Sequence, residues 1–234
     1  MSRHARPARA DAILSVMEAI LEPLVRSPKL KLYVDELTET LRREHAARMR
    51  FRQALDEDVR AEFINGEVVE HVTARDAHTA TVHRVATLLR VYAQVRGAGT
   101  VRCEQALAEF TRNDYAPDVC YWRTAKAAGF RADTVVYPVP DLIVEVLSSS
   151  TERRDRGVKF EDYAAHGVGE YWIVDPDGRV IEQHVLDGAE YGLVGRHTVG
   201  ATLASRVLDG FVMPVTAAFD DDANLAALWQ LKPR

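Results

Sequence analysis

The chain has 234 residues, 47% of them hydrophobic and 28% charged, which suits one globular domain with a sizeable core. Its formal net charge is -5 and its pI is about 5.9, so the overall charge does not indicate nucleic-acid binding. Contact with a nucleic acid would need a local patch of basic residues. The apolar runs are too short to cross a membrane, and we expect a soluble, cytoplasmic protein with no membrane partner. Cys103 and Cys120 lack the spacing of a zinc site and are expected to be buried, reduced thiols.

Residues 1–60 are expected to form a tail and a helical extension ahead of a main domain over 61–234. The segment 1–10 is basic but lacks the apolar core of a signal peptide, which predicts a disordered tail. Apolar residues then recur at helical spacing with an interruption near Pro28, which predicts two helices. The second helix ends in arginines that could hold phosphates or form a solvated helix face. These arginines are Arg42, Arg43, Arg48, Arg50 and Arg52.

The main domain is predicted to contain a hairpin, a helix, three strands, a second helix, a second hairpin and short closing elements. The first hairpin turns at Asn65-Gly66, a pair that supplies positive φ. The second helix is capped by Ser149 in a capping box, with Thr151 as the alternative cap. The ranges are 61–72 for the first hairpin, 75–96 for the helix that stops at Gly97, 100–110, 115–122 and 137–148 for the strands, 151–166 for the helix that ends at Gly167, 170–186 for the second hairpin and 224–231 for the last helical turns. This order predicts one mixed α/β domain.

The third predicted strand carries two acids, although a buried carboxylate is costly unless it is paired. Strand periodicity places Asp141 and Glu145 on one face with Ile143 and Leu147. Asp118 lies 27 residues before Glu145, on what would be the neighbouring strand. Two carboxylates on adjacent strands can hold Mg2+, which prefers oxygen ligands and keeps several waters. Asp118 and Glu145 are therefore predicted to share a divalent metal ion that activates water against a phosphate.

The segment 140–176, PDLIVEVLSSSTERRDRGVKFEDYAAHGVGEYWIVDP, resembles the signature block of the bacterial Uma-two family of restriction-endonuclease-like proteins, within the PD-(D/E)xK nuclease superfamily. The likeness runs from about Phe63 to Phe219 and includes FINGEVVEH, APDV and VLDGF. It implies a restriction-endonuclease-like mixed β-sheet core, αβββαβ, flanked by helices. It also implies a Mg2+- or Mn2+-dependent endonuclease that hydrolyses the phosphodiester bonds of DNA, with Asp118 and Glu145 as the acids of the motif.

One position departs from the motif of that superfamily. The residue two after Glu145, where the motif has lysine, is Leu147. Lys159 is the predicted replacement, because strand and helix rises place it level with Glu145 if the helix packs back on the sheet. There it would orient or help deprotonate the attacking water and stabilise the charged phosphate. The alternative is an exposed lysine that pairs with Asp155 one turn earlier.

Other residues are candidates for supporting roles. In the superfamily an acid near the first helix often completes the metal site, so Glu67 is either a third carboxylate ligand or a solvated glutamate. His78 could bind phosphate or make a local hydrogen bond, and Asp141 could support the site or simply begin its strand. Three arginines near the start of the second helix could hold a nucleic-acid backbone or form an exposed helix end. These are Arg153, Arg154 and Arg156.

Two further functions stay open at this point. Leu147 and the acidic pI also suit a non-catalytic binding module that keeps the nuclease fold, and no motif separates DNA from RNA or structured DNA as the substrate. A homodimer is one option, because two symmetric sites would cut both strands of a duplex. The sequence contains no GxSxG, HExxH, P-loop or GxGxxG motif, so serine hydrolases, zincins, P-loop NTPases and Rossmann enzymes lack their usual anchors.

Overall fold

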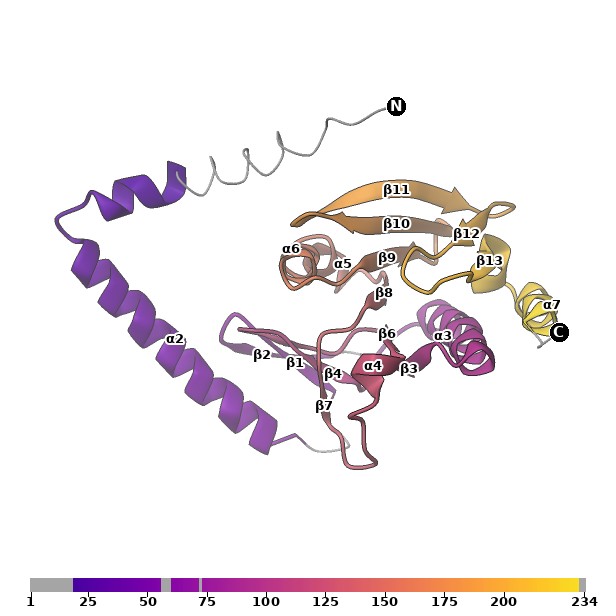
Figure 1. The fold of residues 1–234 in the computed structure, drawn as a ribbon, viewed down its shortest axis with the longest axis horizontal. Helices are drawn as coiled ribbons and strands as arrows, with labels where there is room; N and C mark the ends of the chain where they lie inside the picture. The colour runs from indigo at the N-terminus through magenta and orange to yellow at the C-terminus, as the bar shows by residue number, and fades with distance from the viewer. Residues whose placement is uncertain (1–18, 56–59, 72, 232–234) are drawn as a thin grey trace. The chain divides into compact units, whose positions relative to one another are not determined.

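The structure is a computed structural model that describes residues 19–55, 60–71 and 73–231 (Figure 1). The predicted tail, residues 1–10, lies outside the described residues. The described chain divides into two compact units, 19–55 with 65–68 and 60–64 with 69–231.

The first unit contains the two helical segments that the apolar spacing predicts. Residues 19–25 are helical, and α2 follows at Leu30–Gln53 after a break at the predicted position. Pro28 lacks a backbone N–H and disfavours helical conformation in the residue before it, which accounts for the break. In the middle of α2, Arg42 donates a hydrogen bond to Glu39 Oε2 at 2.8 Å, so this arginine is engaged within its own helix.

A six-stranded sheet forms the centre of the second unit. Its elements in chain order are α3 Asp76–Arg96, β3 Gly99–Cys103, β6 Val119–Arg123, β8 Leu142–Val146, α5 Glu152–Asp155, α6 Val158–Ala165, β9 Glu170–Asp175, β10 Val180–Asp187 and β11 Glu190–Thr198. The strand order is β11-β10-β9-β8-β6-β3, with β6 antiparallel and β9 parallel to β8. The parallel pair is joined by the crossover through α5 and α6. The predicted order αβββαβ is therefore confirmed.

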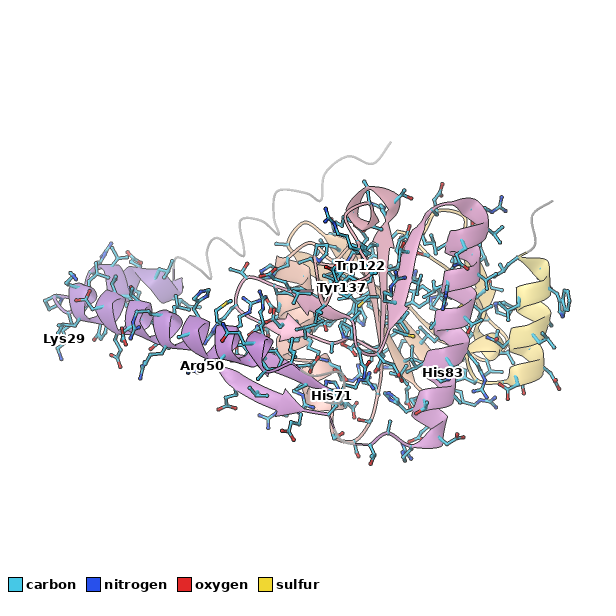
Figure 2. All side chains as sticks on the ribbon, turned by 90° about the horizontal axis from the view of Figure 1, so that it is seen from below. Lys29, Arg50, His71, His83, Trp122 and Tyr137 are labelled. Atoms are coloured by element: carbon cyan, nitrogen blue, oxygen red, sulfur yellow. The ribbon has the colours of Figure 1, made fainter. Side chains whose placement is uncertain are left out.

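A five-stranded sheet takes up segments that the sequence predicts as parts of longer strands. Its strands are β1 Ala61–Ile64, β2 Glu67–Glu70, β4 Leu107–Glu109, β5 Asp114–Tyr115 and β7 Val136–Tyr137, in the order β2-β1-β5-β4-β7. The first predicted strand of the core divides into β3 and β4 because Glu104 adopts a φ of 59°, which interrupts extended backbone. The second divides into β5 and β6 near Pro117, which has no N–H for the ladder. Trp122 of β6 and Tyr137 of β7 pack together with ring centroids 5.3 Å apart (Figure 2).

Strand β8 is buried on both faces, because each face meets a separate hydrophobic core. Leu142, Val144 and Val146 belong to the core that contains the buried face of α3. Ile143 and Leu147 belong to the core that contains residues of α6. The alternation predicted for this strand is confirmed.

The predicted helix over 151–166 is interrupted. It divides at Gly157 into α5 and α6, and a Cβ at this position would lie 2.8 Å from a backbone oxygen of the preceding turn. Thr151 occupies the N-cap position, so the prediction of Ser149 as the cap is wrong, but the Thr151 side chain makes no capping hydrogen bond. The physical reason is a turn before the helix, in which Thr151 N donates to Ser148 O at 3.2 Å.

The predicted turn glycines have the conformations that their roles require. Asn65 and Gly66 have φ values of 50° and 89°, as the hairpin turn predicts. Gly97 ends α3 with a φ of 60°, and Gly167 follows α6 with a φ of 77°. These left-handed conformations carry little steric cost for glycine.

The cysteines differ in exposure. Cys120 in β6 is buried as predicted, but Cys103 is exposed, so that part of the prediction is wrong. The reason is that β3 is an edge strand of its sheet, and Cys103 is its last residue.

The chain closes with β12 Thr202–Ala204, β13 Val212–Pro214, the short helix η1 Val215–Ala218 and α7 Asp221–Gln230. Helix α7 begins earlier than the predicted 224–231 because the side chain of Asp220 accepts a hydrogen bond from Ala223 N and caps it. In the ranges that the structure describes, no helix combines the length and the apolar character needed to cross a bilayer.

Candidate active site

A cavity of about 340 Å³ opens where the end of β8 approaches the start of α3. Hydroxyl side chains of residues 148–151 form part of its lining. The charged and imidazole side chains of the lining are Arg60, Glu70, His71, Arg75, His78, Asp118, Glu145, Arg154 and Lys159. The fold therefore brings the predicted acids and the predicted lysine into one cavity.

Each of the two predicted acids accepts a backbone hydrogen bond from the segment that carries the other acid. Asp118 directly precedes β6, and Glu145 lies in β8, with Val119 opposite Val144 in the ladder. Asp118 N donates to Glu145 Oε2 at 3.3 Å, and Val146 N donates to Asp118 Oδ2 at 2.7 Å. Both side chains are buried, so their carboxylates have little freedom to reorient.

Lys159 faces the acids from α6. Its Nζ lies 3.0 Å from Glu145 Oε1, 2.9 Å from Glu62 Oε1 and 3.5 Å from Asp155 Oδ1. Only 2% of the Lys159 side chain is exposed, which rules out the alternative of a solvated lysine that pairs with Asp155 alone. The rise along β8 and α6 predicted that Lys159 and Glu145 would be level, and packing of α6 on the sheet turns them toward each other.

The hairpin contributes Glu62, which the sequence interpretation missed, instead of Glu67. Glu62 lies fully buried in β1, and its Oε1 accepts a hydrogen bond from Ala116 N at 2.9 Å as well as one from Lys159. Glu67 is exposed in β2 and belongs to the first unit, where it is a solvated glutamate, the alternative given above. The signal that could have identified Glu62 is the one that identified Glu145, an acid within a short apolar strand.

The buried charges change one another's pKa values. Burial lowers the pKa of Lys159, but the surrounding carboxylates outweigh it and raise the pKa well above its ordinary value. Burial raises the pKa of Glu62, but Lys159 and His71 oppose it and bring the pKa to about 2. At Glu145 burial dominates over Lys159, so its pKa is raised well above the ordinary value. Lys159 is thus an ammonium at neutral pH, and Glu145 is far easier to protonate than Glu62.

Two buried nitrogens around the cavity have no hydrogen-bond partner among the described residues. They are Nε of Arg60 and Nε of Arg154; Oε2 of Glu62 and Nε2 of His71 make only a contact of 3.5 Å with each other, and Oδ1 of Asp155 lies 3.5 Å from Lys159 Nζ. Unsatisfied buried atoms of this kind are uncommon in folded interiors, because each one costs stability. The nitrogens can donate to an anionic ligand, and the oxygens can accept from water or contact a cation.

The carboxylates of the cavity include the two that the sequence predicts to hold a divalent metal ion. In the described part of the chain, no group of three or more His, Cys, Asp or Glu side chains is arranged to hold a metal. Two oxygens of these acids have only long contacts: Asp118 Oδ1 lies 3.4 Å from His78 Nε2 and 3.7 Å from Arg60, and Glu145 Oε2 accepts a single bond of 3.3 Å. Mg2+ binds through one or two carboxylates and keeps several waters. Asp118 and Glu145 therefore fit Mg2+ or Mn2+ without the predicted third carboxylate.

The structure places His78 and Asp141 differently. His78 lines the cavity beside Asp118, and although burial lowers its pKa, the hydrogen bond and charge of Asp118 raise it above the ordinary value. Asp141 lies before β8, where its Oδ2 accepts from Arg123 N at 2.8 Å and its Oδ1 contacts Lys126 Nζ at 3.0 Å. Asp141 is thus engaged at the start of its strand, apart from the lining of the cavity.

The three candidate arginines also separate. Arg154 lines the cavity, and its Nε is buried. Arg156 pairs with Glu182 at 2.7 Å and Glu152 at 2.9 Å, and Arg153 is exposed on α5. Arg154 is therefore the one of the three that the fold directs to the site.

Comparison with known proteins agrees with this fold. The Uma2 family, described as "Putative restriction endonuclease", matches residues 47–216. A search of curated proteins gives no match. Among solved structures, a protein from Anabaena variabilis ATCC 29413, described as "a putative nuclease belonging to DUF820", is similar with a TM-score of 0.62 and 14% identity, over 76% of this chain and 96% of that chain. This likeness shows a shared fold, and the family match identifies that fold as restriction-endonuclease-like.

Proposed function

The chain belongs to the Uma2 family of restriction-endonuclease-like proteins, and on that premise we propose that it is a divalent-metal-dependent endonuclease that hydrolyses phosphodiester bonds of DNA. The observation that supports the proposal most strongly is the meeting of Asp118, Glu145 and Lys159 in one cavity. Lys159 supplies the ammonium that Leu147, in the usual lysine position, cannot supply.

Each of these residues has a role that follows from its chemistry. Asp118 and Glu145 would hold Mg2+ or Mn2+, which when bound would activate water and offset the charge that builds on the phosphate. Because the pKa of Lys159 is raised, its ammonium does not accept a proton at neutral pH. We therefore assign Lys159 to orienting the attacking water and stabilising the phosphate, and not to deprotonation.

Glu62 would position Lys159. Its Oε1 is shared between Lys159 Nζ and Ala116 N, at 2.9 Å in both cases. Ala116 lies two residues before Asp118, so one carboxylate fixes the lysine and the segment that carries the acid. Such an indirect contact is expected to affect the rate without contacting the substrate.

The remaining lining suits a phosphate. Nε of Arg154 is a buried donor without a partner in the described chain, and His78, whose Nε2 lies 3.4 Å from Asp118 Oδ1, lines the same cavity. Charge-assisted hydrogen bonds from such donors are a common way to hold phosphate oxygens. We assign Arg154 and His78 to the phosphate of the substrate, and a homodimer that presents two sites to a duplex belongs to the same proposal.

The first experiment is incubation of the purified protein with supercoiled plasmid and with single-stranded oligonucleotides, in Mg2+ or Mn2+ and in EDTA. We expect cutting with the ion and none in EDTA. Asp118→Asn is expected to slow cutting by about 10³-fold, because it removes a charged ligand of the ion. Asp141→Asn is the matched control, since Asp141 is 8% exposed and Asp118 7%, but only Asp118 lines the cavity.

Each outcome separates the candidate functions. Undiminished cutting by a folded Asp118→Asn protein would overturn the site. Cutting of RNA or branched DNA alone would keep the site and change the substrate. Absence of cutting, with calorimetry showing Mn2+ binding that Asp118→Asn loses, would favour a non-catalytic binding module. Gel filtration of the same sample tests the homodimer.

A further inference from the structure

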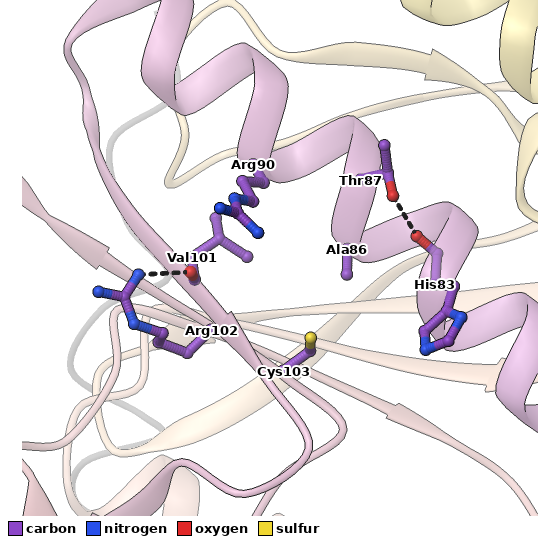
Figure 3. Close-up of a pocket in the computed structure, with 7 residues that line it drawn as sticks. All are labelled: His83, Ala86, Thr87, Arg90, Val101, Arg102 and Cys103. Carbon is purple, nitrogen blue, oxygen red and sulfur yellow. Dashed lines mark hydrogen bonds between the residues drawn. The ribbon is translucent and has the colours of Figure 1, made fainter. Parts of the chain in front are cut away.

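A second cavity, of about 510 Å³, lies between α3 and β3 (Figure 3). Three of its lining residues, His83, Thr87 and Arg90, are exposed and recur along α3 at intervals of four and three residues, so they share one face of the helix. Arg102 and Cys103 are exposed on β3, where adjacent side chains point to opposite faces of the sheet, so Arg102 lines the groove from the edge of the sheet. We call this cavity, defined by these five residues, the α3–β3 groove.

The arginines of the α3–β3 groove have no internal anion. Arg102 donates to the Val101 carbonyl oxygen at 3.0 Å (Figure 3). In the part of the chain that the structure describes, neither Arg102 nor Arg90 forms an ion pair with a carboxylate. The nearby carboxylate of Glu104 lies 3.9 Å from Arg60 instead. Guanidinium groups present several donors in a fixed plane, which suits the oxygens of an external phosphate.

The α3–β3 groove adjoins the candidate active site through the pairing of β3 with β6. Cys103 pairs with Val119, and one residue further along Glu104 N donates to Asp118 O at 3.0 Å. Arg60 connects the same two residues, at 3.9 Å from Glu104 and 3.7 Å from Asp118. The end of the groove is therefore one ladder position away from a predicted metal ligand.

Helix α3 contributes to both cavities, since His78 lines the first and Arg90 the second. The rise of an α-helix places these two residues about 18 Å apart along the axis. At about 3.4 Å per base pair, that distance corresponds to roughly five steps of B-DNA. The axial distance between the two cavities is therefore within the length of a short duplex.

We propose that the α3–β3 groove binds the phosphate backbone of DNA on one side of the cleavage site, through Arg90 and Arg102. The proposal rests on the proposed function for the identity of the ligand and adds a contact outside the reacting centre. Contacts to phosphates position the nucleic acid without reading its sequence, so the groove increases affinity for DNA of any sequence. It also supplies the local basic patch that an acidic chain needs for this partner.

The test is fluorescence anisotropy with a labelled DNA duplex of about 20 base pairs, in EDTA so that no cutting occurs, at several salt concentrations. The Arg90→Ala/Arg102→Ala double variant is expected to bind at least about tenfold more weakly and to lower the slope of log K against log salt by about 2. Arg96→Ala is the matched control, because Arg96 lies on the same helix, packs over the Tyr92 ring and does not line the groove. A duplex of RNA of the same length provides the second arm.

The readout does not depend on catalysis. An unchanged affinity and salt slope in the double variant, or no binding of either duplex by the wild-type protein at low salt, would overturn the proposal. Loss of DNA binding in a protein that cuts nothing would support the groove while the nuclease proposal fails. Stronger binding of the RNA duplex, lost in the same variant, would support the groove and replace DNA with RNA as its ligand.

Discussion

Glu145 and Glu170 are both buried glutamates in adjacent parallel strands of the central sheet, and their surroundings differ. Glu170 accepts hydrogen bonds at both oxygens, from three side chains and two backbone amides. These donors are Trp172 Nε1 at 2.7 Å, Gln183 Nε2 at 2.6 Å, Ser205 Oγ at 2.6 Å, Arg206 N at 2.8 Å and Val207 N at 3.0 Å. No Lys, Arg or His pairs with Glu170 within the described ranges. Glu145 has the cation Lys159, the hydroxyl of Tyr163 at 2.8 Å and one long amide contact, and it opens onto a cavity.

Glu170 is a carboxylate that holds the fold, whereas Glu145 is one that is available for chemistry. Glu170 uses its acceptor capacity to fix the segment that contains Arg206 and Val207, which leaves nothing for a ligand. In the cluster around Lys159, Glu62 Oε2 and Asp155 Oδ1 have only long contacts of 3.5 Å, with His71 and Lys159. Incomplete pairing inside a protein is costly, and natural proteins tend to tolerate such costs at functional sites. The same substitution in the two glutamates should therefore have opposite consequences.

The largest expected effect is on the activity of Glu145→Gln. Loss of this carboxylate should reduce metal-dependent cleavage by about 10³-fold, or about 4 kcal/mol of transition-state stabilisation. Stability at pH 7 should fall less than in Glu170→Gln, because Lys159 keeps its contacts with Glu62 and Asp155 when the charge of Glu145 is removed. Plasmid cleavage and urea unfolding measure the two effects. A variant that unfolds readily and cuts normally once folded would reverse the assignment.

Glu170→Gln should show the opposite pattern and a somewhat smaller effect. An amide nitrogen would face hydrogen-bond donors, so we expect a loss of about 3 kcal/mol in the free energy of unfolding. Cleavage per folded molecule should stay at the wild-type level, because Glu170 does not line the cavity. Urea unfolding, with cleavage assayed well below the transition, provides the measurement. A selective loss of cleavage would show that this acid has a role in the site.

Glu62→Gln should reduce the cleavage rate less than Glu145→Gln, by about 10- to 100-fold, since Glu62 acts through Lys159. DNA affinity measured in EDTA should not change, whereas a merely structural defect would reduce affinity and rate together. Glu62 has an unfolded pKa near 4.5 and a folded pKa of about 2, so its charged form stabilises the protein above pH 4.5. That contribution is lost as the pH falls from 4.5 toward 2. The stability difference between wild type and Glu62→Gln should shrink across this window in urea titrations, and a constant difference would refute the buried pair.

Much of the fold was predictable because it depends on local rules. Left-handed glycines, the Asn65-Gly66 turn and the apolar alternation of β8 are properties of short segments, and the structure confirms them. The division of the first predicted strand could not be predicted, because Glu104 adopts a positive φ that its residue type does not require. The break at Gly157 could not be predicted either, because a glycine within a helical pattern is often tolerated without ending the helix.

The sequence by itself determined the order of the elements, the family and the two acids, since a charge in an apolar strand needs a partner wherever that strand lies. It also indicated Lys159 as the replacement lysine, because strand and helix rises place it level with Glu145 along the sheet. Only the tertiary structure decided that α6 turns Lys159 toward Glu145, that Glu62 and not Glu67 joins them, and that Asp141 pairs with Lys126 instead. The physical reason is that strand and helix rises fix distances along each element, whereas the direction in which a side chain faces a distant element is set by how those elements pack.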